Sequence, residues 1–184
     1  MKVILFLATG FEEVEAITVV DYLRRVGIDI QTVSITDELL VKGSHAIKIM
    51  ADKKISDINS IDGLEGIIIP GGLPGATNLR DNQRVIDFVK AAHEEKKLVA
   101  AICAGPIVPH KAGILKEKNI TSYPGLEDQL KGSIYMNTKV VRDNNIITAQ
   151  GPYLAVDFAI EIVKYLLNED IANELKKDIL YDTK

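Results

Sequence analysis

The single cysteine of the chain, Cys103, lies in the run Lys97–Pro106, where a buried strand is expected to turn sharply into a helix. A thiol at such a corner points outward from the sheet. Nearby backbone amides and the helix N-terminus can then stabilise negative charge on sulfur or on a bound oxyanion. The neighbours Ala101, Ala104 and Gly105 are small, as a nucleophile elbow requires where the backbone passes close to itself. A lone cysteine is more often an inert small hydrophobe, so reactivity depends on what the fold places beside it.

A second chemically informative residue is Glu15, in the helix predicted over Glu12–Val26. At 100° per residue, Glu15 falls at the edge of the apolar face of this helix, where a carboxyl group is partly desolvated and its pKa is raised. That apolar face consists of Ala16, Val19, Val20, Leu23 and Val26. Glu12 and Glu13 are expected to be solvated, at a helix start where the dipole favours acidic side chains.

Short apolar runs alternate with helical patterns along the chain, and these elements must position the two groups. Strands are predicted over Val3–Ala8, Ile28–Ile35, Ile67–Ile69, Leu98–Ile102, Asn119–Ser122, Ile134–Tyr135, Lys139–Arg142 and Ile146–Thr148. Besides the first helix, helices are predicted over Val85–Glu94, from Cys103 to near Gly113, and over Pro152–Leu167 and Ile171–Leu180, with a hairpin over Leu39–Met50. The alternation predicts one α/β domain over residues 1–184, with a mostly parallel sheet covered on both faces.

The carboxyl ends of parallel strands share one edge of a sheet, and sites form there. The strands that precede Glu15, Gly71-Gly72 and Cys103 all end on that edge, so these residues are expected to converge. The amide of Ala104 would face the reacting centre, and a second amide from Gly72 would complete an oxyanion hole.

Composition excludes several classes of protein. The formal charge of −4 and the absence of a basic block argue against nucleic acid or an anionic membrane surface as partner. No apolar run approaches the roughly 20 residues of a membrane span, and no signal peptide is evident. One cysteine excludes an intramolecular disulfide and a multi-cysteine metal site, and it favours a reducing cytoplasm.

Three blocks together resemble the ThiJ/PfpI superfamily, most closely the ThiJ-like branch that contains the parkinsonism-associated protein deglycase. The blocks are Gly10-Phe-Glu-Glu-Val-Glu-Ala16, Ile69-Pro-Gly-Gly-Leu-Pro-Gly-Ala-Thr-Asn-Leu79 and Ala100-Ala-Ile-Cys-Ala-Gly-Pro106, and Gly151-Pro152 before a long helix also fits. The resemblance runs over nearly the whole chain. It implies a flavodoxin-like three-layer sandwich, usually a homodimer, with no cofactor and no metal.

The resemblance also implies roles for particular residues. Cys103 corresponds to the reactive thiol, Glu15 to the carboxyl group that hydrogen-bonds the sulfur and moves protons, and Gly72 and Ala104 to the amide donors. Gly71, Tyr123, Arg25 and His45 match positions that line the pocket, His45 from either the same subunit or its partner. Two departures stand out. Many relatives have a histidine in place of Tyr123, whose phenol is a poor base at neutral pH, and some have an arginine at position 45.

The far side of the first helix mixes apolar and charged groups, namely Val14, Ile17, Thr18, Asp21 and Arg25. A neighbouring loop or the hairpin would explain this face, and so would a homodimer contact through the first helix and the hairpin.

Two functions remain open. Peptidase and glutamine amidotransferase chemistry are disfavoured, because Ala104 stands where the peptidase-like branch has a histidine and no histidine follows His110. A Cys–Glu pair could instead convert methylglyoxal, or its early adducts, to a hydroxy acid as a cofactor-independent glyoxalase or deglycase, a lyase or hydrolase. Alternatively, a thiol of low pKa could oxidise to a stable sulfinate and serve, without turnover, as an oxidative-stress sensor or redox-regulated chaperone.

Overall fold

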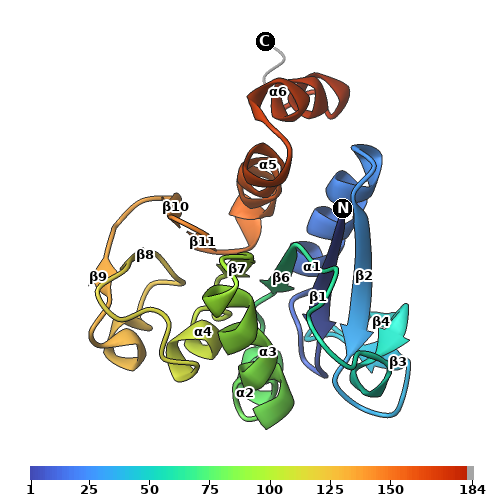
Figure 1. The fold of residues 1–184 in the computed structure, drawn as a ribbon, viewed down its shortest axis with the longest axis vertical. Coiled ribbons are helices and arrows are strands. Elements are labelled where there is room, and N and C mark those ends of the chain that lie inside the picture. Colours follow the sequence, from blue (N-terminus) through green and yellow to red (C-terminus); the bar gives the residue numbers. More distant parts are fainter. Residues whose placement is uncertain (182–184) are drawn as a thin grey trace.

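A seven-stranded sheet forms the centre of the computed structural model, which describes residues 1–181 (Figure 1). Its strands, in spatial order, are β10 (Val140–Asp143), β11 (Ile146–Ala149), β7 (Leu98–Ile102), β6 (Gly66–Ile69), β1 (Lys2–Leu7), β2 (Asp29–Ser34) and β5 (Lys53–Lys54). All neighbouring strands pair in parallel except β10, which pairs antiparallel with β11. The last three residues of the predicted domain, 182–184, lie outside the described part of the chain.

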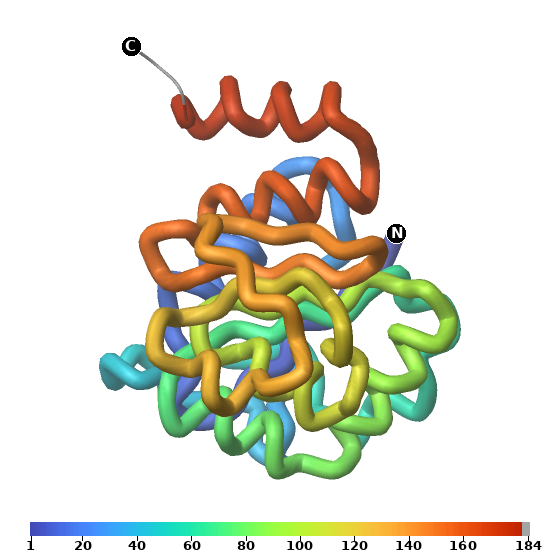
Figure 2. The backbone as a smooth tube through the Cα atoms, turned by 90° about the vertical axis from the view of Figure 1, so that its left-hand side faces the viewer, coloured from blue at the N-terminus to red at the C-terminus, as the bar shows by residue number. Residues whose placement is uncertain are grey.

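Helices cover both faces of this sheet. One layer consists of α1 (Glu13–Arg25), α5 (Ala155–Leu166) and α6 (Glu169–Asp178), and the other of α2 (Gly75–Arg80), α3 (Gln83–Glu94) and α4 (Ile107–Lys111). Figure 2 shows α6 lying outside α5, so the C-terminal helix extends the first layer. The arrangement confirms the predicted three-layer sandwich with a mostly parallel sheet.

The apolar core divides into two parts, one on each face of the sheet. Successive side chains of a strand point to opposite faces. Leu5 of β1 therefore packs with the α1–α5 layer, whereas its neighbour Phe6 packs with the α3 layer. Both side chains are fully buried, which stabilises the fold by about 1.5–3 kcal/mol for each. Continuous apolar runs such as the one in β1 are what a sheet buried on both faces requires.

Smaller elements lie around the edge of the sandwich. The strands β3 (Leu40–Lys42) and β4 (Lys48–Met50) form the predicted hairpin, and β8 (Asn119–Ile120) pairs in parallel with β9 (Ile134–Tyr135). Three 3₁₀ turns complete the set, at Ile55–Asp57, Glu127–Leu130 and Pro152–Leu154. In the part of the chain that the structure describes, no helix has both the length and the apolar character needed to cross a membrane.

Two local predictions from the sequence were wrong, and one helix was not predicted. The helix that was not predicted is α2, which begins at Gly75, directly after the glycine- and proline-rich segment 70–74. The helix after Cys103 begins only at Ile107, since residues 103–106 form turns. The helix predicted from Pro152 starts as the 3₁₀ turn Pro152–Leu154 before α5 begins.

Candidate functional site

The elbow at the end of β7 holds Cys103 in a strained backbone conformation, with a φ of 62°. Its amide donates to the Ala149 carbonyl at 2.9 Å, and its carbonyl accepts from the Tyr123 amide at 2.9 Å, so both neighbouring segments fix the corner. At Gly105 an added Cβ would lie 2.7 Å from the Ile69 carbonyl oxygen. The small residue predicted at this position is therefore a steric requirement, and the strain is held at the residue that carries the thiol.

Glu15 enters the site from the first turn of α1 and is fully buried. Its Oε2 accepts a hydrogen bond from the Gly71 amide at 2.7 Å, and the Cys103 thiol is hydrogen-bonded to the same carboxyl group. Within residues 1–181, Oε1 has no nitrogen or oxygen partner. A polar atom buried in this way costs free energy, so the carboxyl group is held here against its preference for water.

Gly71 marks the point where the groups converge. A Cβ built on Gly71 would lie 2.6 Å from the Cys103 Cβ, 2.7 Å from Glu15 Oε2 and 2.9 Å from the Ala104 amide nitrogen. The carboxyl ends of β1, β6 and β7 therefore bring these residues together at one edge of the sheet. The topological switch point of the sheet, where the strand order reverses, lies between β1 and β6 at the same edge.

Two backbone amides face the sulfur. The amides of Ala104 and Gly72 both donate to Cys103. Gly72 can aim its amide in this direction because its φ is 83°, a conformation that favours glycine. A pair of amides so placed can bind an oxyanion or an oxidised sulfur.

Burial raises the pKa of both titrating groups. It raises the pKa of Glu15 from 4.5 to about 7, and hydrogen bonds from the Gly71 amide and the Cys103 thiol oppose this shift. Burial, followed by the charge of Glu15, raises the pKa of Cys103 to about 12, and the two amides only partly offset this. The surroundings therefore raise the thiol pKa, whereas the sequence predicted that it would be low.

Tyr123 lies beside the elbow, as the resemblance implied. Its ring passes over Gly151, where an added Cβ would meet Tyr123 Cδ2 at 3.4 Å. The side chain is half exposed.

Comparison with known proteins gives the same assignment along the whole chain. The model of the DJ-1/PfpI family matches residues 1–165. The chain is 35% identical to protein dj-1beta of Drosophila melanogaster over 179 residues, which covers 96% of this chain and 95% of that protein. It is 31% identical to the Parkinson disease protein 7 homolog of Danio rerio over 182 residues, with 97% and 96% covered. The solved structure of oxidised DJ-1 from Toxoplasma gondii superposes with a TM-score of 0.94 at 33% identity, and 99% of each chain is covered.

The chain belongs to the DJ-1/PfpI family.

Two residues that the DJ-1/PfpI resemblance placed at the pocket lie elsewhere in this subunit. Arg25 sits in the last turn of α1, ten residues and about 15 Å along the helix from Glu15. It forms ion pairs with Asp21 at 2.9 Å and with Asp178 at 3.1 Å. The helical periodicity predicted the position of Arg25 on the far side of α1 correctly, whereas the pocket position implied by the resemblance is not found in this subunit.

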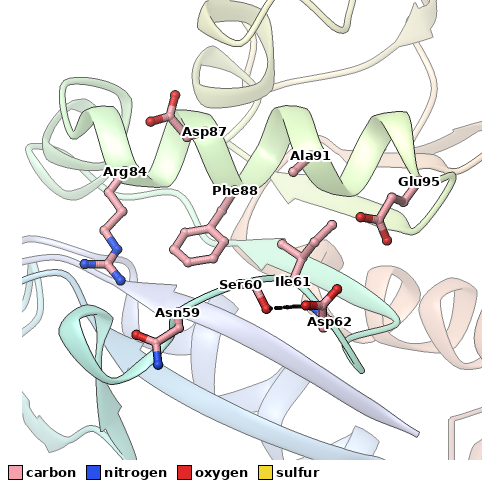
Figure 3. A pocket seen from close by; sticks show the side chains of 9 residues that line it. All are labelled: Asn59, Ser60, Ile61, Asp62, Arg84, Asp87, Phe88, Ala91 and Glu95. Atoms are coloured by element: carbon pink, nitrogen blue, oxygen red, sulfur yellow. Dashed lines mark hydrogen bonds between the residues drawn. The ribbon is translucent and has the colours of Figure 1, made fainter.

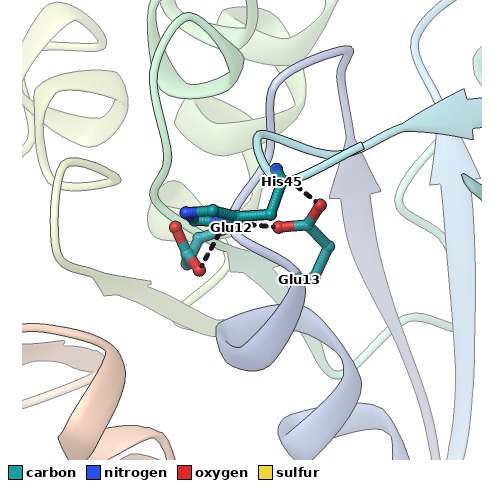
Figure 4. Close-up of side chains that lie close together, drawn as sticks. All are labelled: Glu12, Glu13 and His45. Carbon is teal, nitrogen blue, oxygen red and sulfur yellow. Dashed lines mark hydrogen bonds and ion pairs between the residues drawn. The ribbon is translucent and has the colours of Figure 1, made fainter. Parts of the chain in front are cut away.

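His45 lies at the turn of the β3–β4 hairpin, where its partners are two carboxylates (Figure 4). Its Nδ1 is 3.1 Å from Glu13 Oε2 and 3.4 Å from Glu12 Oε1. A hydrogen bond to Glu13 and the charge of Glu12 raise the pKa of His45. The three side chains offer atoms within 4.8 Å of one another and could hold a metal ion, but Glu13 is already engaged by backbone amides of the hairpin.

The prediction of side-chain exposure from the sequence is furthest from the structure at Glu13. It is only 4% exposed, although the helix pattern predicted a solvated side chain. Its partners lie more than 30 residues further along the chain, at the hairpin turn, so the pattern of its own helix carries no signal for them.

The other two histidines have partners away from the sulfur. His110 Nε2 is 2.9 Å from the Lys131 carbonyl, and His93 Nδ1 is 3.5 Å from Asn145 Nδ2. Burial lowers the pKa of His93. The Cys103 site of this DJ-1/PfpI protein therefore relies on Glu15 as its titrating partner.

A hollow of about 390 Å³ lies apart from the site, between α3 and residues 59–62 (Figure 3). Phe88 and Ile61 form its floor, and charged side chains such as Asp62 and Arg84 stand around it. Its residues 59–62 come before the amino end of β6, whereas Gly71 and Gly72 of the Cys103 site follow the carboxyl end of that strand.

Proposed function

We propose that this DJ-1/PfpI protein is a cofactor-independent glyoxalase that converts methylglyoxal, or its early adducts on amines and thiols, to a hydroxy acid. The observation that carries the proposal is the buried Glu15 carboxyl group, hydrogen-bonded to the only thiol of the chain and raised in pKa to about 7. A general base works best when its pKa lies near the working pH, and a buried carboxylate beside a thiol meets that condition.

The chemistry balances with water as the only co-reactant. Glu15 takes the thiol proton of Cys103 as sulfur attacks the aldehyde carbon of methylglyoxal, which gives a hemithioacetal. The amides of Gly72 and Ala104 stabilise the developing oxyanion. Glu15 returns the thiol proton to this oxyanion, which completes the neutral hemithioacetal and regenerates the carboxylate. Glu15 then moves a proton from the former aldehyde carbon to the neighbouring carbonyl carbon, while the hydroxyl proton passes to the oxygen of that carbonyl, so that a thioester forms. Water cleaves the thioester to lactate and restores the thiol.

Tyr123 has a limited part in this scheme. A phenol with a pKa near 10 is a poor base at neutral pH but a good hydrogen-bond donor. A half-exposed side chain on the residue that bonds the Cys103 carbonyl suits a donor to the substrate carbonyl, and proton transfer is left to Glu15.

Incubation with methylglyoxal should yield lactate, and the Cys103→Ser variant should fall to the rate without protein. The substitution removes the only thiol and leaves a hydroxyl that Glu15 cannot ionise, so the covalent step is lost. Lactate is measured with stereospecific dehydrogenases. Deglycase activity is distinguished from glyoxalase activity by supplying preformed methylglyoxal adducts together with an aldehyde scavenger. The scavenger removes free methylglyoxal, so that only direct action on the adducts yields lactate. Lactate formation equal in wild type and Cys103→Ser would overturn the proposal.

A second function, oxidative sensing without turnover, is favoured by the two amides that donate to sulfur. A sulfinate offers them oxygen acceptors and can receive a hydrogen bond from protonated Glu15. The similarity to the Toxoplasma gondii protein, solved in its oxidised state, supports this candidate. The reducing cytoplasm expected from the single cysteine would keep the thiol available until oxidant appears.

Mild peroxide should add two oxygen atoms at Cys103, with two equivalents of peroxide consumed and two of water released. Intact mass followed by peptide mapping measures the product, with Cys103→Ser as the control. A thiol that stays reduced, or that passes directly to sulfonate, would contradict the sensor function.

We further propose that the protein is a homodimer that uses α1 and the β3–β4 hairpin. Val14 and Ile17 are 53% and 42% exposed on α1, and Leu40, Ile47 and Met50 of the hairpin are also exposed. Apolar side chains gathered on neighbouring elements are typical of an interface. Light scattering should give about twice the mass of one chain. Ile17→Glu should shift the mass toward the monomer, because it places a charge in the contact, whereas Tyr153→Glu, at an exposed position outside these two elements, should not.

A further inference from the structure

Glu13 holds the tip of the β3–β4 hairpin through its carboxylate. Oε1 accepts from the amides of His45 at 2.8 Å and Ile47 at 3.3 Å, and Oε2 lies 3.1 Å from both Ser44 Oγ and His45 Nδ1 (Figure 4). Burial opposes the charge, but the hydrogen bonds outweigh it and lower the pKa of Glu13 to about 2. The carboxylate is thus permanently ionised near neutral pH and binds two otherwise unpaired backbone donors.

The hairpin fits closely around this carboxylate. A side chain at Gly43 would run into the Glu13 carboxyl group, so only glycine is accommodated there. Because Gly43 packs against the Glu13 carboxyl group, the carboxylate and the hairpin are expected to move only together.

The same hairpin is bonded to the segment that leads into α1. The Gly10 amide donates to the Lys42 carbonyl at 2.8 Å, and the Ser44 amide donates to the Phe11 carbonyl at 2.9 Å. Residues 10–12 therefore lie between the hairpin and the rest of the site.

The next contact reaches the reacting groups. The Glu12 amide donates to the Gly71 carbonyl at 3.0 Å, and the Gly71 amide donates to Glu15 Oε2 at 2.7 Å. Gly72 also packs directly on residues 10–12, where an added Cβ would collide with the backbone. Glu13 is thus connected through the hairpin and residues 10–12 to the Gly71 carbonyl, by hydrogen bonds joined through short backbone segments, and Gly72 packs against the same residues.

We propose that Glu13 is a positioning residue for the reaction at Cys103: by fixing the hairpin tip on residues 10–12, it holds the Gly71 and Gly72 amides in place against Glu15 and the sulfur. Glu13 does not touch the reacting atoms. The catalytic part of this inference rests on the proposed function, whereas the positions of the two amides can be measured without any turnover.

Amide hydrogen exchange, followed residue by residue by NMR, tests the proposal in Glu13→Ala. Exchange should accelerate about tenfold or more at His45 and Ile47, which lose their acceptor, and about fivefold or more at Gly71 and Gly72. The amide of Val99 in β7, bonded to the Asn145 carbonyl at the far edge of the sheet, reports any global loss of stability and should change much less.

Glu12→Ala is the matched control. Glu12 also carries a carboxylate close to Ser44 and His45, but it makes only side-chain contacts to the hairpin. It should leave the exchange of all four amides within about twofold of wild type. If Glu13→Ala does not fold, Glu13→Asp serves instead, because its shorter carboxylate cannot reach both hairpin amides; the same pattern is expected at smaller size.

Turnover of methylglyoxal provides the second measurement. Glu13→Ala should lower kcat by about tenfold with little change in KM. We expect this because the variant displaces the groups that act in the reaction and leaves the binding of substrate unchanged. Faster exchange confined to His45 and Ile47, with Gly71 and Gly72 unchanged, would overturn the proposal and leave Glu13 as an anchor of the hairpin alone. Absence of turnover in the wild type would count against the glyoxalase function, and the exchange pattern would still decide the role of Glu13.

Discussion

Replacing Glu15 by glutamine should lower kcat/KM for methylglyoxal by about 10²–10⁴-fold, because the variant keeps the shape of the side chain and loses the base. Wild-type kcat/KM should rise as the pH increases through about 7, where burial places the pKa of Glu15, since the carboxylate is the form that accepts the thiol proton. Initial rates of lactate formation between pH 5.5 and 8.5 measure both effects. A Glu15→Gln variant that retains this rise would show that another group is the base.

The same substitution should stabilise the fold at alkaline pH. The pKa of Glu15 is raised in the folded state, so its contribution to stability is fully present below pH 4.5 and is lost as the pH rises through about 7. Wild type therefore carries a buried carboxylate at pH 8 that Glu15→Gln lacks, and the variant should be more stable there by up to about 3 kcal/mol, with little difference at pH 4. Urea unfolding at the two pH values measures this, and equal stability at pH 8 would mean that the carboxyl group is not desolvated.

Gly71→Ala should disrupt the arrangement of the reacting groups directly. The added Cβ would be 2.6 Å from the Cys103 Cβ, 2.7 Å from Glu15 Oε2 and 2.9 Å from the Ala104 amide nitrogen, so it forces the thiol, the base and an oxyanion donor apart. We expect a loss of about 1–3 kcal/mol in the free energy of unfolding from overpacking, and at least about a 10²-fold loss of kcat/KM from misplacement.

Gly151→Ala is the matched control for this prediction. It lies at the same edge of the sheet in an extended conformation, with a φ of −178°, and its added Cβ would make an ordinary contact of 3.4 Å with Tyr123 Cδ2. Stability and activity near those of wild type are expected. If Gly71→Ala had the same stability and activity as Gly151→Ala, this would contradict the close approach of Cys103, Glu15 and Ala104 around Gly71.

Much of the site can be read from the sequence because its determinants are local. The small residues around Cys103 mark a tight corner, and the periodicity of α1 places Glu15 at the edge of the apolar face. Alternating strands and helices put the ends of β1, β6 and β7 on one edge of a parallel sheet, which is enough to predict that Glu15, Gly71 and Cys103 meet. Each inference uses only residues within one element, or the rules of sheet topology.

Only the tertiary structure decided the features that depend on partners distant in the chain. Glu13 belongs by periodicity to a solvated helix start, yet the hairpin turn more than 30 residues away buries it and binds its charge. The direction of the Cys103 pKa shift was likewise beyond local reasoning: the amides at the elbow lower the thiol pKa, but burial and the Glu15 carboxyl group outweigh them and raise it. The sequence by itself thus determined which residues meet at the edge of the sheet. Their desolvation and charge balance arose from packing, because free energies of burial depend on all the elements that surround a group.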